Sequence, residues 1–165
     1  IETAAMIISQ ARDAGITCPI MAGDTWDDIS IAQRTGDKAT EIFFSAFFDS
    51  ADATNEAGKT FAEGFTKWVA EDSVRTENNG GVSDVVSSVT PCGYDAYMAA
   101  VGAIEKANST DGKTIRDALA GLEIQGLITG DLKFDENGDA IKNYAVIKTI
   151  KDGNIVYYST FNGLN

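Results

Sequence analysis

The sequence predicts an α/β fold in which helices flank a parallel sheet and the chain ends in a β-hairpin. Three observations support this prediction. A helical pattern, a glycine and a short apolar strand follow one another at the start of the chain, which is half of a βαβ unit and implies parallel strands. The apolar run Glu41 to Phe48 suits a strand that is covered on both faces. Two alternating segments near the end flank Asp152-Gly153, a dipeptide typical of tight hairpins.

The first part of the chain is predicted to alternate between helix and strand. The first helix ends near Gly15, and its apolar residues recur at helical spacing: Ala4, Ala5, Ile7, Ile8 and Ala11. We expect a strand over Ile16 to Met21, although Pro19 cannot donate a hydrogen bond within it. A weak second helix follows over Trp26 to Gln33 and ends near Gly36, before the strand over Glu41 to Phe48.

The middle of the chain is predicted to be mainly helical. Apolar residues mark one face of the first helix there: Phe61, Phe65, Trp68 and Val69. The stretch Glu71 to Ser88 has no sustained period and is expected to be a mobile surface loop. A long helix is expected over Pro91 to Ala107, with proline near its start, and a shorter one over Lys113 to Ala120.

The end of the chain is predicted to be extended. Asp135 to Asp139 invites comparison with a calcium loop, but the sixth loop position would be Ala140 in place of glycine and the twelfth Val146 in place of glutamate. The stretch is therefore interpreted as a polar turn. Tyr144 to Ile150 and Ile155 to Phe161 are the expected hairpin strands.

Composition restricts the classes of partner. The 165 residues carry a net charge of −12 without any Lys or Arg cluster, which argues against nucleic acid and anionic membranes. No apolar run approaches the roughly 20 residues that cross a bilayer. Cys18 and Cys92 are interpreted as buried or half-buried thiols, with one disulfide as the alternative. Because histidine is absent, zinc is not expected, and no metal or cofactor is predicted.

The stretch Ile20 to Trp26 is the most informative for function. It places Asp24 where a strand ends, and open α/β sheets bind ligands at the carboxyl ends of their strands. The residues allow another interpretation, in which Gly23 forms the turn and Asp24 or Thr25 caps the next helix. Asp27 and Asp28 are interpreted as part of a solvated helix start.

The sequence contains few of the motifs and residue types that enzymes use, and no catalytic residue is predicted. The sequence has no histidine, no glycine-rich phosphate loop and no nucleophile elbow, and neither cysteine has an evident partner. We therefore expect a binding protein and not an enzyme.

Several motifs in the same order resemble the later half of the branched-chain amino-acid binding proteins of ABC importers, which have the periplasmic binding protein type I fold. The first group of motifs is Ala4 to Gly15, Pro19 to Trp26 and Gly36 to Glu41. The second group is Gly93 to Tyr97, Ala103 to Ala107, Thr114 to Leu119 and Gly130 to Asp139. Together they cover nearly the whole chain.

The resemblance implies two α/β lobes that close over a small ligand, with an ABC permease as the membrane partner. In the family an acidic residue after the strand holds the ligand's ammonium group, and the matching residue is Asp24; Gly23, Thr25 and Trp26 are the neighbouring candidates. Trp26 would pack on the ligand or the opposite lobe. The chain differs from the family pattern in two places. The segment that brings an aromatic residue to the ligand in relatives falls near Val89 and Thr90, where this chain has none, and the loop Glu71 to Ser88 is longer than is usual.

The resemblance also divides the chain between the lobes. Residues 1–46 and 142–165 are expected in the C-terminal lobe, and residues 47–141 in the N-terminal lobe. The first half of the protein is expected to precede Ile1, and without it the helices of the middle stretch would need another cover, such as a second or swapped copy.

The resemblance implies a periplasmic or extracellular location, in which the protein could be anchored to the membrane as a lipoprotein. A ligand-sensing or regulatory module on the same fold is the alternative function, because it would use the same lobe closure.

Overall fold

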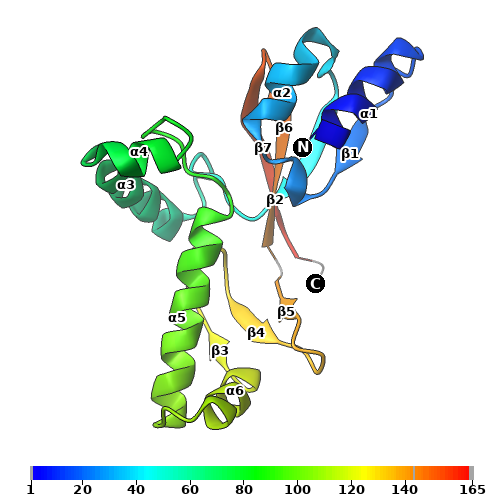
Figure 1. Cartoon of the computed structure of the whole chain (residues 1–165). Coiled ribbons are helices and arrows are strands. Elements are labelled where there is room, and N and C mark those ends of the chain that lie inside the picture. Colours follow the sequence, from blue (N-terminus) through cyan, green and yellow to red (C-terminus); the bar gives the residue numbers. More distant parts are fainter. Residues whose placement is uncertain (1, 143, 164–165) are drawn as a thin grey trace.

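In the computed structural model, which describes residues 2–142 and 144–163, the helices and strands form two groups. One group combines the two ends of the chain around a four-stranded sheet, and the other contains the middle of the chain (Figure 1). The α/β class and the C-terminal hairpin are confirmed. None of the helices in the described residues has the length and apolar character that a membrane span requires.

The four-stranded sheet has the order β1-β2-β6-β7 and is mixed. Strand β1 (Ile20–Ala22) runs parallel to β2 (Ile42–Ala46), as the helix-strand alternation predicted. Strand β6 (Tyr144–Lys151) is antiparallel to β2 and to β7 (Asn154–Asn162). The parallel arrangement is therefore limited to the first pair, because the hairpin supplies the other strands.

Two helices cover one face of this sheet. They are α1 (Glu2–Asp13) and α2 (Ile29–Thr35), and a short 3₁₀ turn η2 (Gly36–Lys38) follows α2. Their apolar faces meet alternate residues of β2 and β6 in one core: Ala4, Ile8, Ile31, Ala32, Ile42, Phe44 and Ile150. Alternation along β2 thus decides which side chains lie under the helices.

The first strand is shorter than predicted. Arg12 donates hydrogen bonds to the carbonyls of Ile16 and Cys18, at 2.7 and 3.1 Å, and so holds that segment as a loop. Pro19 has no N–H with which to extend the ladder. The strand consequently begins at Ile20, and Arg12 reaches on to the carbonyl of Thr40 just before β2.

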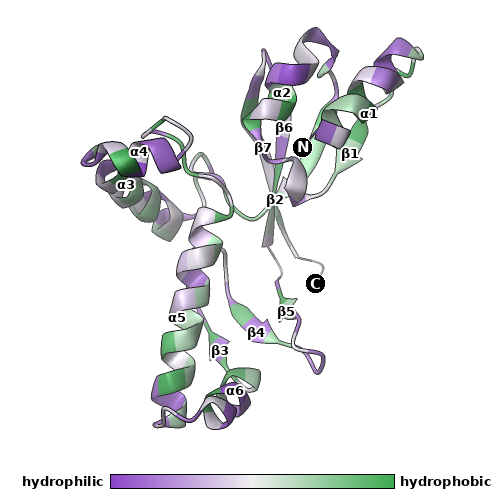
Figure 2. Cartoon of the chain, viewed as in Figure 1, coloured by the Kyte–Doolittle hydropathy of each residue, from purple (hydrophilic) through white to green (hydrophobic). Residues whose placement is uncertain are grey.

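The middle of the chain forms four helices and a small sheet within the described residues. The helices are α3 (Glu56–Ala70), α4 (Ser73–Asn78), α5 (Thr90–Ala107) and α6 (Gly112–Ala120). The antiparallel strands β3 (Glu123–Ile124), β4 (Leu132–Phe134) and β5 (Ala140–Ile141) have that order in the sheet. Figure 2 shows apolar residues recurring along α5 and in the strands beside it. Ala99, Leu127 and Leu132 form the core between these elements.

The predicted mobile loop from Glu71 to Ser88 is wrong in its first half, where α4 forms. The Asp72 carboxylate accepts hydrogen bonds from the N–H groups of Val74 and Arg75, which caps the helix. Arg75 also lies 4.3 Å from the ring centre of Trp68, whose ring is half-exposed at the end of α3. The capping residue was present in the sequence, but a six-residue helix gives too short a period to recognise.

Several other local predictions can be compared with the structure. The β6–β7 hairpin is confirmed, and Asp152 and Gly153 both have the positive φ of its two-residue turn. Asp135 accepts hydrogen bonds from the N–H groups of Asn137 and Asp139, so this stretch is a polar turn. Both cysteines are free; Cys92 is half-buried as expected, but Cys18 is exposed because its segment is the loop held by Arg12.

Helix α3 contains two glycines in different surroundings. A Cβ atom on Gly58 would lie 2.7 Å from Phe48 Cε2 and 2.8 Å from the Asn55 side chain, whereas one on Gly64 would meet nothing within 4 Å. We expect Gly58→Ala to lower the free energy of unfolding by about 1 to 3 kcal/mol through overpacking. Urea denaturation of the full-length protein measures this change.

Gly64→Ala is the matched control for that measurement. It adds the same methyl group to the same helix and should raise the free energy of unfolding by up to about 1 kcal/mol, since alanine is the better helix former. Equal effects of the two substitutions would contradict the close approach of Phe48 to α3.

Candidate functional site

The Asp24 turn lies directly after β1. Residues Asp24–Trp26 form a 3₁₀ turn, η1, closed by hydrogen bonds from Trp26 N–H to the Gly23 carbonyl and from Asp27 N–H to the Asp24 carbonyl. Helix α2 begins only at Ile29, and Asp28 caps it by accepting from Ser30 N–H at 2.8 Å. The prediction that Asp24 or Thr25 caps this helix is therefore wrong, as is the predicted start at Trp26. The Asp24 side chain is left for another role.

The neighbours of Asp24 differ in exposure. Gly23 and Thr25 are exposed, and a Cβ atom on Gly23 would meet nothing within 4 Å, so the turn is open above this residue. Trp26 is half-buried and packs against the core beneath α1 and α2. A contact of Trp26 with a ligand therefore stays a prediction.

The first turn of α5 is electrostatically coupled to the Asp24 turn. Burial raises the pKa of the Cys92 thiol, and the carboxylates of Asp95 and Asp24 raise it further, while Lys142 opposes them. Within the described residues Asp24 makes no ion pair or side-chain hydrogen bond, in contrast to Asp27 and Asp28.

A buried ion cluster lies behind the Asp24 turn. The ammonium group of Lys148 on β6 lies 2.9 Å from an Asp27 carboxylate oxygen and 3.3 Å from an Asp49 one. The side chains of Lys148 and Asp27 are only 7% and 8% exposed. Asp49 follows β2, and its carboxylate also accepts from Ala51 N–H. The cluster thus connects the Asp24 turn with both strands at which the chain passes between the two groups of elements.

A second polar network surrounds Asp52 at the same passage. Its carboxylate accepts from the hydroxyls of Tyr144, Thr160 and Thr54, at 2.5, 2.9 and 2.7 Å. Burial acts to raise the pKa of Asp52, but the hydrogen bonds from Tyr144 and Thr54 outweigh it and hold that pKa below its ordinary value of 3.8. Burial and the bond to Asp52 raise the pKa of Tyr144. The network fixes the start of β6 and the end of β7 to the segment after β2.

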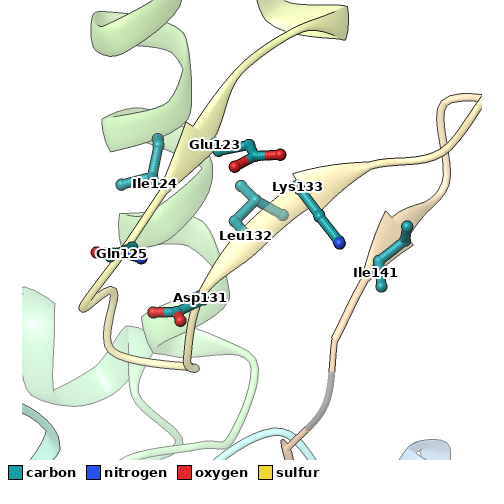
Figure 3. A pocket seen from close by; sticks show the side chains of 7 residues that line it. All are labelled: Glu123, Ile124, Gln125, Asp131, Leu132, Lys133 and Ile141. Carbon is teal, nitrogen blue, oxygen red and sulfur yellow. The ribbon is translucent and has the colours of Figure 1, made fainter.

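Two hollows lie in the second group of elements. One, of about 540 Å³, is mainly apolar and lies between α5 and β4; Phe47, Cys92 and Lys142 are among its lining residues. The other, of about 300 Å³, lies on the small sheet, where Glu123, Lys133 and Ile141 come from three adjacent strands (Figure 3). Neither hollow is lined by Asp24, so neither by itself forms the predicted site.

The sequence contains a signal for the ion cluster that its motifs do not reveal. In β6 every second residue points to the same face of the sheet, and on one face these residues are buried: Val146, Lys148 and Ile150. A lysine at an apolar position needs a carboxylate partner, because an unpaired buried charge is costly. Asp27, interpreted from the sequence as part of a solvated helix start, is that partner. Asp52 gave no such signal because it lies in an irregular segment.

A comparison with protein families identifies the class. The model of the periplasmic binding protein family matches residues 1–154, and the chain therefore belongs to this family. The match includes the Asp24 turn, the Lys148 cluster and strand β6, whereas Thr160 of the Asp52 network lies beyond the matched residues.

Solved structures agree with this assignment. The chain is similar to LivK, a leucine-binding protein of Thermotoga maritima, with 30% identity and a TM-score of 0.75 over 98% of this chain and 42% of that one. It is 25% identical to an ABC transporter substrate-binding protein of Desulfitobacterium hafniense in complex with leucine, with a TM-score of 0.65 over 93% of this chain and 39% of that one.

A third structure shares the fold at lower identity. It is the branched-chain amino-acid transporter binding protein LivJ of Streptococcus pneumoniae in complex with isoleucine, at 22% identity and a TM-score of 0.69, covering 97% of this chain and 41% of that one. The chain thus spans about two fifths of the length of each of these three proteins.

The Asp52 network predicts a pH-dependent effect of Tyr144→Phe. At pH 7 loss of the hydroxyl donor should lower the free energy of unfolding by about 1.5 to 3 kcal/mol, since the acceptor is charged. The pKa of Asp52 is depressed in the folded protein. The network's contribution is therefore present above the unfolded pKa and is lost as pH falls through the lower folded pKa.

Urea denaturation of the full-length wild type and variant at pH 7 and near pH 3 measures this dependence. The difference between the two proteins should narrow at the lower pH. Tyr158→Phe on β7 is the control, because this ring is 60% exposed and its loss of a hydroxyl should have little effect at either pH. A Tyr144→Phe difference that stays constant with pH would contradict the bond to a charged Asp52.

Proposed function

We propose that this chain is part of an extracytoplasmic solute-binding protein that captures an amino acid between two lobes and delivers it to an ABC permease. One observation carries the proposal: in a member of the periplasmic binding protein family, the Asp24 carboxylate stands at the carboxyl end of β1 and has no ion-pair or hydrogen-bond partner among the described residues. An ammonium group is the natural partner for such a carboxylate.

The ligand class is supported by similarity and by charge. Leucine-binding LivK and the leucine complex from Desulfitobacterium hafniense are similar to this chain at 30% and 25% identity. Two carboxylates, those of Asp27 and Asp49, already surround the ammonium group of Lys148, and Asp24 in the same turn as Asp27 adds a further negative charge, so the local charge favours a cationic group of a ligand. A branched-chain amino acid satisfies both conditions, with its ammonium group on Asp24.

The two groups of elements correspond to the proposed lobes. Residues 1–46 and 142–165 belong to the C-terminal lobe in this proposal, and residues 47–141 to the N-terminal lobe. Strands β2 and β6 lead to the two passages between the groups, and the Asp52 network joins these passages. We propose that the apolar hollow of about 540 Å³ beside α5 is covered by further elements of the N-terminal lobe, or by a second or swapped copy of the chain.

Two further parts of the proposal concern location and class. Membership in the family implies an extracytoplasmic location. A periplasmic or cell-surface protein, the latter with a lipid anchor, fits this location. A binding role without catalysis is proposed because the similar proteins are described as binding proteins. A sensory module on the same fold would bind its ligand equally, and the presence of a permease beside it in the genome would separate the two roles.

The central prediction concerns Asp24→Asn in the full-length protein. The fold should persist, while affinity for L-leucine, or for the amino acid that binds best in a thermal-shift screen, should fall about ten- to a hundredfold. The reason is that an amide cannot replace the charged partner of an ammonium group. Isothermal titration calorimetry measures the change.

Asp28→Asn is the matched control, since it removes a nearby carboxylate while asparagine still caps α2. Its affinity should stay close to that of the wild type. If Asp24→Asn binds as tightly as the wild type, Asp24 does not hold the ligand.

A further inference from the structure

Lys148 is bonded to the Asp24 turn and to the passage after β2 at the same time. Asp27, its first partner, is the residue that closes the turn, because its N–H donates to the Asp24 carbonyl at 3.0 Å. Asp49, its second partner, begins the segment that leaves β2, and its carbonyl accepts from Asp52 N–H at 3.1 Å. One ammonium group therefore connects the proposed ligand turn with the passage between the two groups of elements.

The surroundings of Lys148 make this connection rigid. Its side chain points to the helix-covered face of the sheet, opposite Phe44 of β2, which is 1% exposed. The three side chains of the cluster are 7%, 8% and 15% exposed, so water cannot readily replace any of the contacts. In such an environment a shift of one charged partner forces the others to follow, because an unpaired buried charge is costly.

We propose that Lys148 is a positioning residue for ligand binding. It holds the main chain of the Asp24 turn through Asp27, and through Asp49 it ties the position of this turn to the passage between the lobes. The expected effect of Lys148 on ligand affinity rests on the proposed function, whereas its effect on the position of the turn does not. A purely stabilising ion cluster would leave the turn where it is once its charges were removed together.

The test removes the whole cluster at once in the full-length protein. The triple variant Asp27→Asn, Asp49→Asn and Lys148→Met leaves no buried charge unpaired, and such neutral replacements often preserve stability. The control is the double variant Asp13→Asn and Lys38→Met, which removes a Lys–Asp pair between α1 and η2 whose side chains are 64% and 43% exposed. All proteins carry Trp68→Phe, with phenylalanine also in place of any tryptophan outside these 165 residues, so that fluorescence comes from Trp26, in the Asp24 turn.

Trp26 fluorescence without ligand is the first measurement. We expect stronger acrylamide quenching and a red-shifted emission in the triple variant, with a urea unfolding midpoint near that of the wild type. The control should match the wild type in both. Unchanged emission and quenching in the triple variant would overturn the positioning role. If the triple variant does not fold, Lys148→Arg decides the question: it keeps the charge but alters the distance to Asp27, and an unchanged Trp26 signal would again overturn the role.

Affinity for L-leucine is the second measurement. We expect the triple variant to bind roughly three- to thirtyfold more weakly than the wild type, and the control to bind as the wild type does. A triple variant with displaced Trp26 but unchanged affinity would overturn the link from the turn to the ligand. A wild type that binds no amino acid would contradict the proposed function, and the fluorescence comparison would still decide whether Lys148 positions the turn.

Discussion

The buried ammonium group of Lys148 is the constraint around which the four-stranded sheet is organised. A charge on the covered face of a sheet is acceptable only with carboxylates beside it, since burial of a lone ion costs several kcal/mol. Its two partners come from segments far from it in sequence, with Asp27 121 residues away. The pairing therefore fixes the Asp24 turn, the end of β2 and the middle of β6 relative to one another, and the apolar core packs around that arrangement.

Local patterns predicted much of this fold. Asp152-Gly153 identified the hairpin because only a few dipeptides adopt its turn, and the spacing of Ile8 and its neighbours identified α1. Two of the failures come from side-chain hydrogen bonds and ion pairs. Arg12 holds Ile16 and Cys18 in a loop, which shortened β1, and Lys148 withdraws Asp27 from solvent. Helix and strand propensities describe neither contact, since Arg12 bonds to carbonyls four and six residues away and Lys148 lies 121 residues from Asp27.

The candidate site was predictable to the extent that it depends on strand geometry. Asp24 lies directly after β1 because the strand ends at Ala22, and this much follows from the apolar run and the glycine. That α2 would be capped by Asp28 in place of Asp24 could not be predicted, because both residues are good caps and the 3₁₀ turn between them leaves no mark in the sequence. The influence of Asp24 on the pKa of Cys92 depends on the three-dimensional arrangement of residues far apart in the chain, which is a tertiary property.

The pairing of β2 with β6 has a consequence for the order in which the chain folds. The hydroxyl of Thr149 on β6 donates to the carbonyl of Ile42 on β2, 107 residues earlier. Bringing the ends of a flexible loop of that length together costs about 4 kcal/mol in chain entropy. The β6–β7 hairpin and the helices of the intervening segment depend on nearer contacts, and helix formation in that segment shortens the loop before it closes. The helices in the middle of the chain thus have to form before β2 and β6 can pair. If they form slowly, the edge of β2 that pairs with β6 stays exposed and can pair with the same edge of another molecule.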